Sequence, residues 1–310
     1  MGLRWVRRVV CTRPVTDFTT DADPARTAAA AAEARAREAL AGTRFGDVRW
    51  LAVTGSTNED VLRLARAGEA EGIVVAADLQ TAGRGRRGRT WEAPAGSSLM
   101  ATVLLRPPAR VAALATATVA LAAAEAVEAA CGATPRLKWP NDLVWPGDGS
   151  GPDRKLAGIL AEADWPAGSG IADGWREPRP TDRVAVAVGI GLNVAWAGRA
   201  PAELTDVAVA LDEVVGAEGP PDRVDLLVGL LRRLDALDAE LRAEGGRAAV
   251  LARWRARSAT LGRRVRVDLG SDDVEGTAVD VTEDGHLVVE TLEGTRRELA
   301  VGDVVHLRDR

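Results

Sequence analysis

The chain has 310 residues, of which 46% are apolar, and its formal net charge at pH 7 is -5. This length allows one large or two modest domains with a buried core. The acidic balance argues against general nucleic-acid affinity, which is typical of basic domains. No apolar stretch reaches the roughly 20 residues of a membrane helix. Cys11 and Cys131 lack metal or redox spacing, which favours a reducing cytoplasm.

Residues 1 to 22 lack periodicity and are expected to form a frayed tail. The alanine-rich run from Pro24 to Leu40 is predicted to be a helix by propensity. No helix-turn-helix pair can be drawn in residues 1 to 45, so no DNA-binding domain is expected there.

The stretch VRWLAV, residues 48 to 53, alternates as a strand does and runs into GSTNEDVLRLARAG, which carries a helix-start signature. Helix capping explains Ser56 and Thr57 as well as a binding role does. It does not explain Asn58, because the chain otherwise avoids asparagine. The buried-type strand GIVVAADLQ then delivers Gln80 to a loop.

This loop, QTAGRGRRGRTW from Gln80 to Trp91, is called the arginine loop below. Its glycines let main-chain N–H groups approach an anion, and its arginines keep their charge at any physiological pH. A solvated basic loop or a nucleic-acid contact would have the same composition. A P-loop is excluded because no Gly-Lys-Ser/Thr follows. An anionic ligand would order this segment.

Beyond this loop, SSLMATVLLRP is a predicted strand and residues 111 to 131 are a predicted alanine-rich helix. RLKWPNDLVW is strand-like and broken by proline, with Lys138, Asn141 and Asp142 around the turn. RKLAGILAEA places Lys155 before an apolar strand, beside a core in which the charge of a lysine matters.

The stretch VAVAVGIGLNV is a predicted buried strand with Gly189 and Gly191 near its end and Asn193 beyond. Leucines at helical spacing predict a helix over residues 222 to 243, and a second helix covers residues 248 to 257.

From Arg263 onward the chain changes to five short alternating strands with tight turns, which predicts a small SH3-like barrel. His286 and His306 both fall here, away from the other motifs, and we expect no catalytic or metal role for them.

Arginine supplies almost all of the 40 basic residues. The few lysine, glutamine and asparagine residues are Lys138, Lys155, Gln80, Asn58, Asn141 and Asn193. Biased codon usage could leave such survivors at random, but all of them fall in five short segments that cover about a tenth of the chain. We therefore infer that their specific side-chain chemistry is required.

The ordered motifs GSTN, QTAGRGRRGRTW, KWPNDL, RKLAGILAE and GIGLNV closely resemble those of the catalytic domain of biotin protein ligases. The resemblance covers residues 46 to 310. It implies an α+β fold, with a mixed-sheet, class II synthetase-like catalytic domain and a C-terminal SH3-like β-barrel. The expected units are a tail and helix over residues 1–45, a biotin- and ATP-binding catalytic domain over 46–261, and the SH3-like domain over 262–310.

In that family biotin and ATP condense to biotinyl-5′-AMP, and biotin then passes to a lysine of a biotin carboxyl carrier protein domain. The resemblance thus implies a cytoplasmic biotin–[acetyl-CoA-carboxylase] ligase that uses ATP with Mg²⁺. It implies a monofunctional enzyme without nucleic-acid or membrane partners, and it leaves room for a homodimer. A carboxylate that attacks a phosphate needs nearby cations, which the motifs supply.

The resemblance also assigns roles to single residues. The catalytic residues would be Lys155 and Arg86. The biotin-binding residues would be Ser56, Thr57, Asn58, Gln80, Arg84, Gly85, Arg86, Lys155, Gly158 and Gly191. The ATP-binding residues would be Arg86, Arg89, Trp91, Lys138, Asn141, Asp142, Lys155 and Asn193, with Asp142 also a ligand of Mg²⁺.

Neutral donors and acceptors such as Asn58 and Gln80 would match the ureido ring, which is a cyclic urea. Lys155 would lie at the junction of carboxylate and phosphate. Trp91 would stack on adenine, and Asn193 would bond its amine.

The sequence differs from the family pattern in two loops, and two alternative functions were considered. The spacer WPGDGSGPDR and residues 165 to 181 look longer than usual and are expected to be surface loops. A lipoate or octanoate ligase or transferase would have a similar fold but lacks the arginine loop. A non-catalytic nucleic-acid-binding module could use that loop, but it would give no reason for Lys155 or Gln80.

Overall fold

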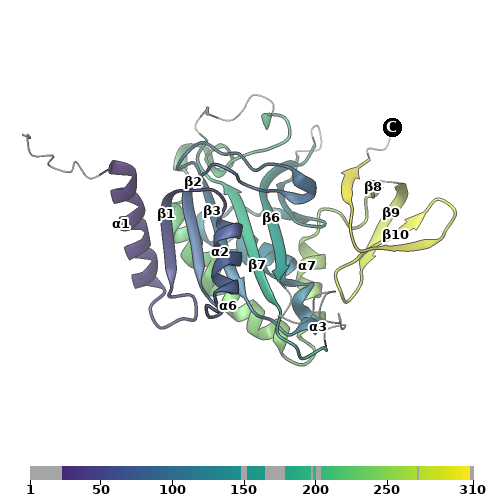
Figure 1. The fold of residues 1–310 in the computed structure, drawn as a ribbon. Helices are drawn as coiled ribbons and strands as arrows, with labels where there is room; N and C mark the ends of the chain where they lie inside the picture. Colours follow the sequence, from purple (N-terminus) through teal and green to yellow (C-terminus); the bar gives the residue numbers. More distant parts are fainter. Residues whose placement is uncertain are drawn as a thin grey trace, which may run out of the picture.

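A computed structural model describes residues 23–147, 152–164, 179–196, 198–199, 204–270 and 272–307. The predicted tail, residues 148–151 of the predicted spacer loop and residues 165–178 of the second predicted loop lie outside these residues. The described chain is organised by a seven-stranded sheet and a five-stranded sheet, which lie side by side (Figure 1). The predicted α+β class with a separate C-terminal β domain is therefore confirmed.

The larger sheet has the strand order β1-β2-β3-β7-β6-β5-β4. Its strands are β1 (Val48–Thr54), β2 (Val74–Gln80), β3 (Ser98–Leu105), β4 (Arg136–Lys138), β5 (Asp142–Trp145), β6 (Arg154–Asp164) and β7 (Ala185–Asn193). β1 and β2 run parallel, and each other neighbouring pair is antiparallel. Every residue of β3 and β7 is buried, because these apolar strands form the centre of the sheet.

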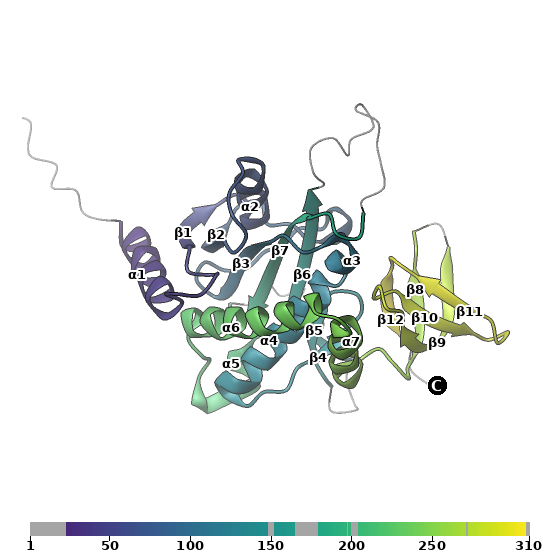
Figure 2. The same cartoon turned by 90° about the horizontal axis from the view of Figure 1, so that it is seen from below.

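Helices cover both faces of the larger sheet (Figure 2). On one face α2 (Thr57–Arg66) packs over a small core that contains Leu104 of β3 and Ala187 of β7. On the other face α4 (Ala115–Cys131) and α6 (Arg223–Arg242) pack together on the neighbouring residues of the same strands, among them Val103 and Val188. The alternation of side chains along a strand thus divides the core into two layers.

The helix predicted over residues 111 to 131 is in fact two helices, α3 (Ala109–Ala112) and α4. Between them the N–H of Leu114 bonds to the carbonyl of Val111 in a tighter turn. Val111 and Leu114 are both fully buried, so the break lets both side chains enter the core. The predicted helices over 222–243 and 248–257 are confirmed as α6 and α7 (Gly246–Arg257). The short helix α5 (Leu211–Val215) precedes them.

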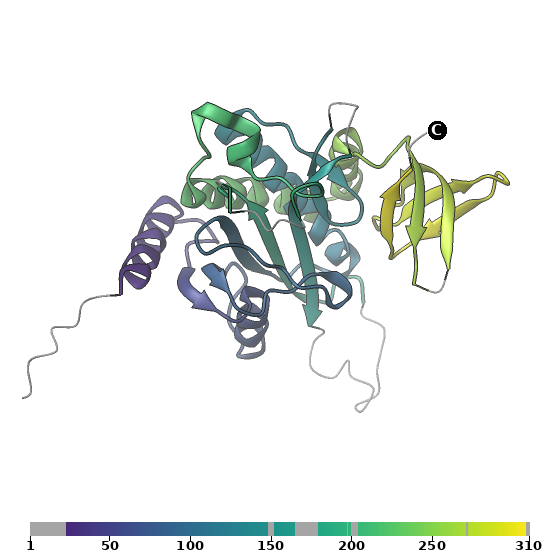
Figure 3. The same cartoon turned by 90° about the horizontal axis from the view of Figure 1, so that it is seen from above.

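The predicted N-terminal helix is confirmed as α1 (Pro24–Ala39), which lies along β1, the first strand of the sheet (Figure 3). A carboxylate oxygen of Glu33 accepts a hydrogen bond from the Trp50 N–H at 2.9 Å. Arg37 Nε donates to the Val48 carbonyl oxygen at 2.7 Å. Two side chains of α1 therefore satisfy backbone groups on the side of β1 that faces away from β2.

The smaller sheet has the order β11-β10-β9-β8-β12, and all of its pairs are antiparallel. Its strands are β8 (Arg264–Asp268), β9 (Asp273–Val281), β10 (Leu287–Thr291), β11 (Arg296–Leu299) and β12 (Asp303–His306). These are the five strands predicted from the alternating pattern. We call this region the C-terminal domain. It lies at the end of the larger domain that is opposite to α1 (Figure 3).

None of the helices in the described ranges has the length and apolar character needed to cross a membrane.

Candidate active site

The sequence motifs converge on two adjoining pockets. The first, which we call the Gln80 pocket, is lined by predicted residues from the start of α2, from β2, β6 and β7, from the turn before β5 and from the arginine loop: Ser56, Thr57, Asn58, Gln80, Arg84, Gly85, Arg86, Arg89, Trp91, Asn141, Lys155, Gly158 and Gly191. The second, which we call the Asn193 pocket, is lined by Trp91, Lys138, Asp142, Lys155 and Asn193 together with apolar side chains that include Trp196, Leu204 and Val207. Every predicted site residue therefore lines at least one pocket, while the individual roles stay predictions.

A hydrogen-bonded network fixes the closed end of the Gln80 pocket. Gln80 Oε1 accepts bonds from the Thr57 backbone N–H at 2.8 Å and from the Thr57 hydroxyl at 3.1 Å. The Thr102 hydroxyl lies 2.8 Å from Thr57 Oγ1 and 2.7 Å from Asn58 Oδ1. Thr57, Asn58 and Thr102 are all buried. Because buried polar groups in a bonded network have few alternative positions, the shape of this end is set before a ligand arrives.

Ser56 is the residue before α2, and its side chain makes no capping hydrogen bond. The predicted capping role of this hydroxyl is therefore wrong. Ser56 is only 2% exposed and lines the Gln80 pocket, where its hydroxyl can serve a ligand.

Glycines of β6 and β7 make room for pocket side chains. A methyl group at Gly189 would overlap Asn58 Oδ1, so this position on β7 can hold no larger residue while Asn58 keeps its place. A methyl group at Gly191 would overlap the Trp91 indole, and one at Gly158 would lie 3.1 Å from it. The indole of Trp91 therefore rests on the backbone surface that the resemblance assigns to biotin.

Trp91 and Lys155 form the partition between the two pockets, since both side chains line each of them. The Lys155 Nζ atom lies 5.6 Å from the centroid of the Trp91 ring, within the range of a cation–π contact. The buried Trp91 Nε1 has no hydrogen-bond partner among the residues that the structure describes. A ligand that extends through both pockets would have to displace this indole.

An ion pair joins the two charged members of the site that lie nearest each other. Lys155 Nζ is 2.7 Å from Asp142 Oδ1. Lys138 lies nearby, and burial lowers the pKa of its ammonium group, an effect that Asp142 and Asp153 partly offset. Lys138 and Lys155 are the cations of the Asn193 pocket, which is also lined by the acidic residues Glu92, Asp142, Asp153 and Asp206. Ammonium groups are suited to hold the phosphates of a nucleotide, and the adjoining Gln80 pocket adds the arginines of the loop.

The predicted Mg²⁺ ligand was tested against the same geometry. Within the ranges that the structure describes, no three His, Cys, Asp or Glu side chains gather as a metal site. Mg²⁺ at nucleotide sites is commonly held by one or two carboxylates together with phosphate oxygens. Asp142 fits that arrangement only if phosphates supply most of the other ligands.

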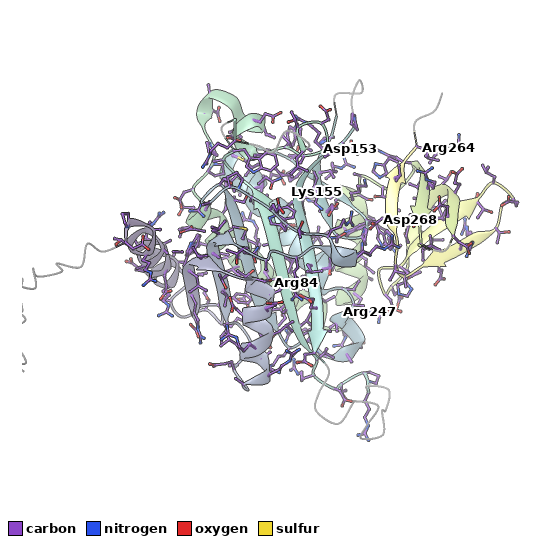
Figure 4. All side chains as sticks on the ribbon, turned by 45° about the horizontal axis from the view of Figure 1, so that its top comes forward. Arg84, Asp153, Lys155, Arg247, Arg264 and Asp268 are labelled. Carbon is purple, nitrogen blue, oxygen red and sulfur yellow. The ribbon has the colours of Figure 1, made fainter. Side chains whose placement is uncertain are left out.

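The arginine loop is held at its first arginine by the larger domain. Arg84 Nη2 lies 2.8 Å from Glu162 Oε2, and the same oxygen accepts a bond from Asn58 Nδ2 at 2.8 Å. Glu162 therefore joins the loop to the network at the closed end of the Gln80 pocket. Figure 4 labels Arg84 of the arginine loop and Lys155 of β6, both on the larger domain.

The later arginines of the loop contact the C-terminal domain. Asp303, at the start of β12, lies 3.7 Å from Arg86, 3.6 Å from Arg87 and 3.0 Å from Arg89. Arg86 also donates to Asn141 Oδ1 at 3.2 Å and to the Gly302 carbonyl oxygen at 3.2 Å. Burial lowers the pKa of Arg86, and the nearby carboxylates oppose that effect. One carboxylate of the C-terminal domain thus gathers three arginines.

Three residues that hold the site together were not predicted from the sequence: Thr102, Glu162 and Asp303. Thr102 could have been found, because it is a hydroxyl residue inside an otherwise apolar central strand. Glu162 and Asp303 resemble ordinary surface acids in sequence, and their roles become visible only through their arginine partners. His306 is distant from the motifs in sequence but near one of them in space, since its Nδ1 lies 3.3 Å from Asp153, two residues before Lys155. The expectation that it has no catalytic or metal role stays a prediction.

Comparison with known proteins agrees with the resemblance to biotin protein ligases that the sequence motifs indicate. Residues 50–164 match the Biotin/lipoate A/B protein ligase family, and residues 260–307 match the Biotin protein ligase C terminal domain. A biotin–[acetyl-CoA-carboxylase] ligase of Mycobacterium tuberculosis is 37% identical over 86% of this chain and 92% of its own. A ligase of the same name from Paracoccus denitrificans is 36% identical over 77% of this chain and 92% of its own.

Among solved structures, a biotin protein ligase from Aquifex aeolicus in complex with biotin and ATP superposes with a TM-score of 0.66. It is 26% identical, and the match covers 86% of this chain and all of that one. The fold and the matched families define an enzyme of the ligase class. The chain belongs to the biotin protein ligase family.

Proposed function

We propose that this enzyme activates biotin with ATP to biotinyl-5′-AMP and then transfers biotin to one lysine of a biotin carboxyl carrier protein domain. The observation that carries the proposal is that two adjoining pockets meet at Lys155. The Gln80 pocket combines neutral hydrogen-bonding groups with loop arginines, and the Asn193 pocket combines two lysines with apolar walls. A ligand with an uncharged ring at one end and a nucleotide at the other would fill both.

The Gln80 pocket suits the uncharged end of that ligand. Ser56 and the Asn58 network present hydroxyl and amide groups and no free carboxylate, which matches a cyclic urea with its carbonyl acceptor and N–H donors. The network holds these groups in place, so little conformational entropy is lost when the ring binds.

The Asn193 pocket suits the nucleotide end. Lys138 and Lys155 provide ammonium groups for phosphate oxygens, and Trp196 and Leu204 provide apolar walls for a base. Asp142, with the phosphates, would hold Mg²⁺, which would neutralise phosphate charge. The predicted pairing of Asn193 with the adenine amine uses its carbonyl oxygen, because its Nδ2 already donates to the Val209 carbonyl oxygen at 3.1 Å.

In the first step a biotin carboxylate oxygen forms a bond to the α-phosphorus, and the bond to the leaving pyrophosphate breaks. In the second step the lysine amine forms a bond to the acyl carbon, AMP leaves, and the amine loses a proton. Both steps concentrate negative charge at the junction between the pockets, where Lys155 and Arg86 lie. Fixed cations at that point stabilise the transition states more than the ground states.

The test is biotin-dependent exchange between ATP and pyrophosphate, measured on the wild type, Lys155→Ala and Arg154→Ala. We expect Lys155→Ala to lower the exchange rate by about 100-fold or more, because it removes a cation from the reacting centre. Arg154 is the matched control, since its side chain pairs with Glu213 outside both pockets. Absence of exchange in the wild type would contradict the proposal.

The same assay decides the main alternative. The matched family also includes lipoate ligases, so lipoate replaces biotin in a parallel reaction. The arginine loop and the matched C-terminal domain favour biotin. A nucleic-acid-binding module would instead give salt-dependent binding to DNA or RNA and no exchange. A location in the cytoplasm, where carboxylases are available, goes with the proposed activity.

A further inference from the structure

Asp153 is a carboxylate at the junction of the two domains, and it also lines the Asn193 pocket. Its side chain is only 8% exposed, and its Oδ2 lies 2.8 Å from Arg263 Nη1 and 3.3 Å from His306 Nδ1. Arg263 Nη1 in turn lies 3.1 Å from the same imidazole nitrogen. Figure 4 labels Asp153 on the side of the larger domain that faces the C-terminal domain. A buried charge with two partners fixes the position of all three groups.

The partners of Asp153 lie at strand ends of the C-terminal domain. Arg263 directly precedes β8, and His306 is the last residue of β12. β12 begins at Asp303, the carboxylate that gathers Arg86, Arg87 and Arg89. Over four residues of extended chain the two ends of β12 are about 10 Å apart. One short strand therefore has its last residue fixed on the larger domain and its first residue on the arginine loop.

We propose that Asp153 is a positioning residue for the arginine loop and acts through β12. Asp153 holds the His306 end of the strand, the strand holds Asp303 in place, and Asp303 holds Arg86 and Arg89 at the Gln80 pocket. Arg87 lies outside that pocket and has a second partner in Asp268 on β8. This inference depends on the proposed function only where it concerns what the arginine loop does in the reaction. The mechanical link itself concerns contacts within this chain.

Limited trypsin digestion of the ligand-free full chain tests the link, because trypsin cleaves after arginine and the loop contains four. The rate of cleavage at Arg84 to Arg89 is measured by mass spectrometry and divided by the rate at sites elsewhere. We expect Asp303→Asn and Asp153→Asn each to raise this ratio at least about threefold, since an undocked loop opens more often. Glu290→Gln is the matched control, because it removes a carboxylate that pairs with Arg296 inside the C-terminal domain.

The double variant separates a link through β12 from two independent effects. If Asp153 acts through Asp303, Asp153→Asn adds nothing to the ratio in the Asp303→Asn background. Additive effects, an unchanged ratio in Asp153→Asn, or a uniform rise at all sites would each overturn the proposal. His306→Gln, which leaves the Asp153–Arg263 pair in place, is expected to raise the ratio less than Asp153→Asn, and an equal or larger rise would also contradict it.

A second readout connects the link to the reaction. In the exchange assay Asp153→Asn and Asp303→Asn should both raise the KM for ATP several-fold and leave the Kd for biotin within about twofold, because the closed end of the Gln80 pocket is held by other bonds. Asp303 lines neither pocket, whereas Asp153 lines the Asn193 pocket, so a raised KM in Asp153→Asn alone would indicate a direct contact and contradict the link. A purely structural role would weaken both. The digestion needs neither biotin nor ATP, so failure of the proposed function and failure of this inference give different results.

Discussion

The closed end of the Gln80 pocket and the arginine loop face the same space but are held in different ways. The pocket end is a network of neutral groups on α2, β2 and β3, in which Thr57 and Thr102 are buried and Gln80 is half-buried. The loop is held by ion pairs to residues far away in sequence, such as Asp303, and Arg89 remains 61% exposed.

The difference in bonding predicts a difference in behaviour. Buried neutral networks are rigid and insensitive to salt, whereas partly exposed ion pairs weaken as salt is added and exchange easily for another anion. We therefore expect the uncharged ring to be recognised by a fixed surface. The loop arginines can leave Asp303 for phosphate oxygens when a nucleotide arrives.

The largest effect is expected from Gly189→Ala, which disrupts the network at the closed end of the Gln80 pocket. The added methyl group would overlap Asn58 Oδ1 and lie 3.1 Å from Thr102 Oγ1. Displacement of the network should raise the Kd for biotin about 10- to 100-fold and lower the free energy of unfolding by about 1–3 kcal/mol. Biotin calorimetry and thermal unfolding measure the two quantities. Gly55→Ala, where nothing lies within 4 Å of the new methyl group, should change neither.

The next largest effect is expected from a change in the arginine loop. Arg86→Gly removes the bonds from the loop to Asn141 and to the Gly302 carbonyl oxygen and adds backbone freedom. We expect roughly tenfold faster release of biotinyl-5′-AMP and biotin labelling of bystander proteins. The label on added albumin reports this. Arg296→Gly, on an exposed arginine of the C-terminal domain, is the control. Unlabelled albumin with Arg86→Gly would contradict a role of the arginine loop in retaining biotinyl-5′-AMP.

A smaller effect is expected from Thr102→Val, which keeps the shape of the rigid region and removes one hydroxyl. Thr57 and Asn58 each lose a partner, so stability should fall by about 1–2 kcal/mol and biotin should bind about fivefold more weakly. Thr118→Val is the control, because that hydroxyl is equally buried but bonds to the Leu114 carbonyl oxygen in α4. It should lose stability without a change in biotin binding, and equal binding losses in both variants would refute a specific role.

At neutral pH the smallest effect is expected from His306→Gln, because its contribution to the pH dependence appears only in acid. Burial, with Lys138 and Arg263, lowers the pKa of His306 to about 4, against about 6.5 in an unfolded chain. Between these values the unfolded chain binds the proton, so stability falls as pH decreases through this window, by up to about 3 kcal/mol. Above pH 6.5 the contribution is complete. The variant should therefore show a shallower decrease of Tm between pH 6.5 and 4, and identical profiles would contradict the assignment.

Sequence patterns were sufficient for the framework of this protein. Apolar runs located the central strands, and the change to short alternating strands located the C-terminal domain. The rare lysine, glutamine and asparagine residues all line the pockets, because side chains with irreplaceable chemistry resist replacement by arginine.

The remaining features depend on long-range contacts that no local pattern encodes. The break before α4 is decided by the burial of both Val111 and Leu114. The pairing of Asp303 with arginines more than 200 positions away is decided by how the domains meet, and one carboxylate looks like another in sequence. The rest position of Trp91 on Gly158 and Gly191 likewise follows from tertiary packing.

The helix along β1 has a consequence for solubility. A free sheet edge is a template on which other chains can add strands, and natural proteins protect such edges. Here the carboxylate of Glu33 and the guanidinium of Arg37 occupy the acceptor and donor positions that a neighbouring strand would use. The helix therefore protects this edge of the sheet against pairing with strands of other chains. This protection matters because β1 also carries the exposed apolar side chain of Val53.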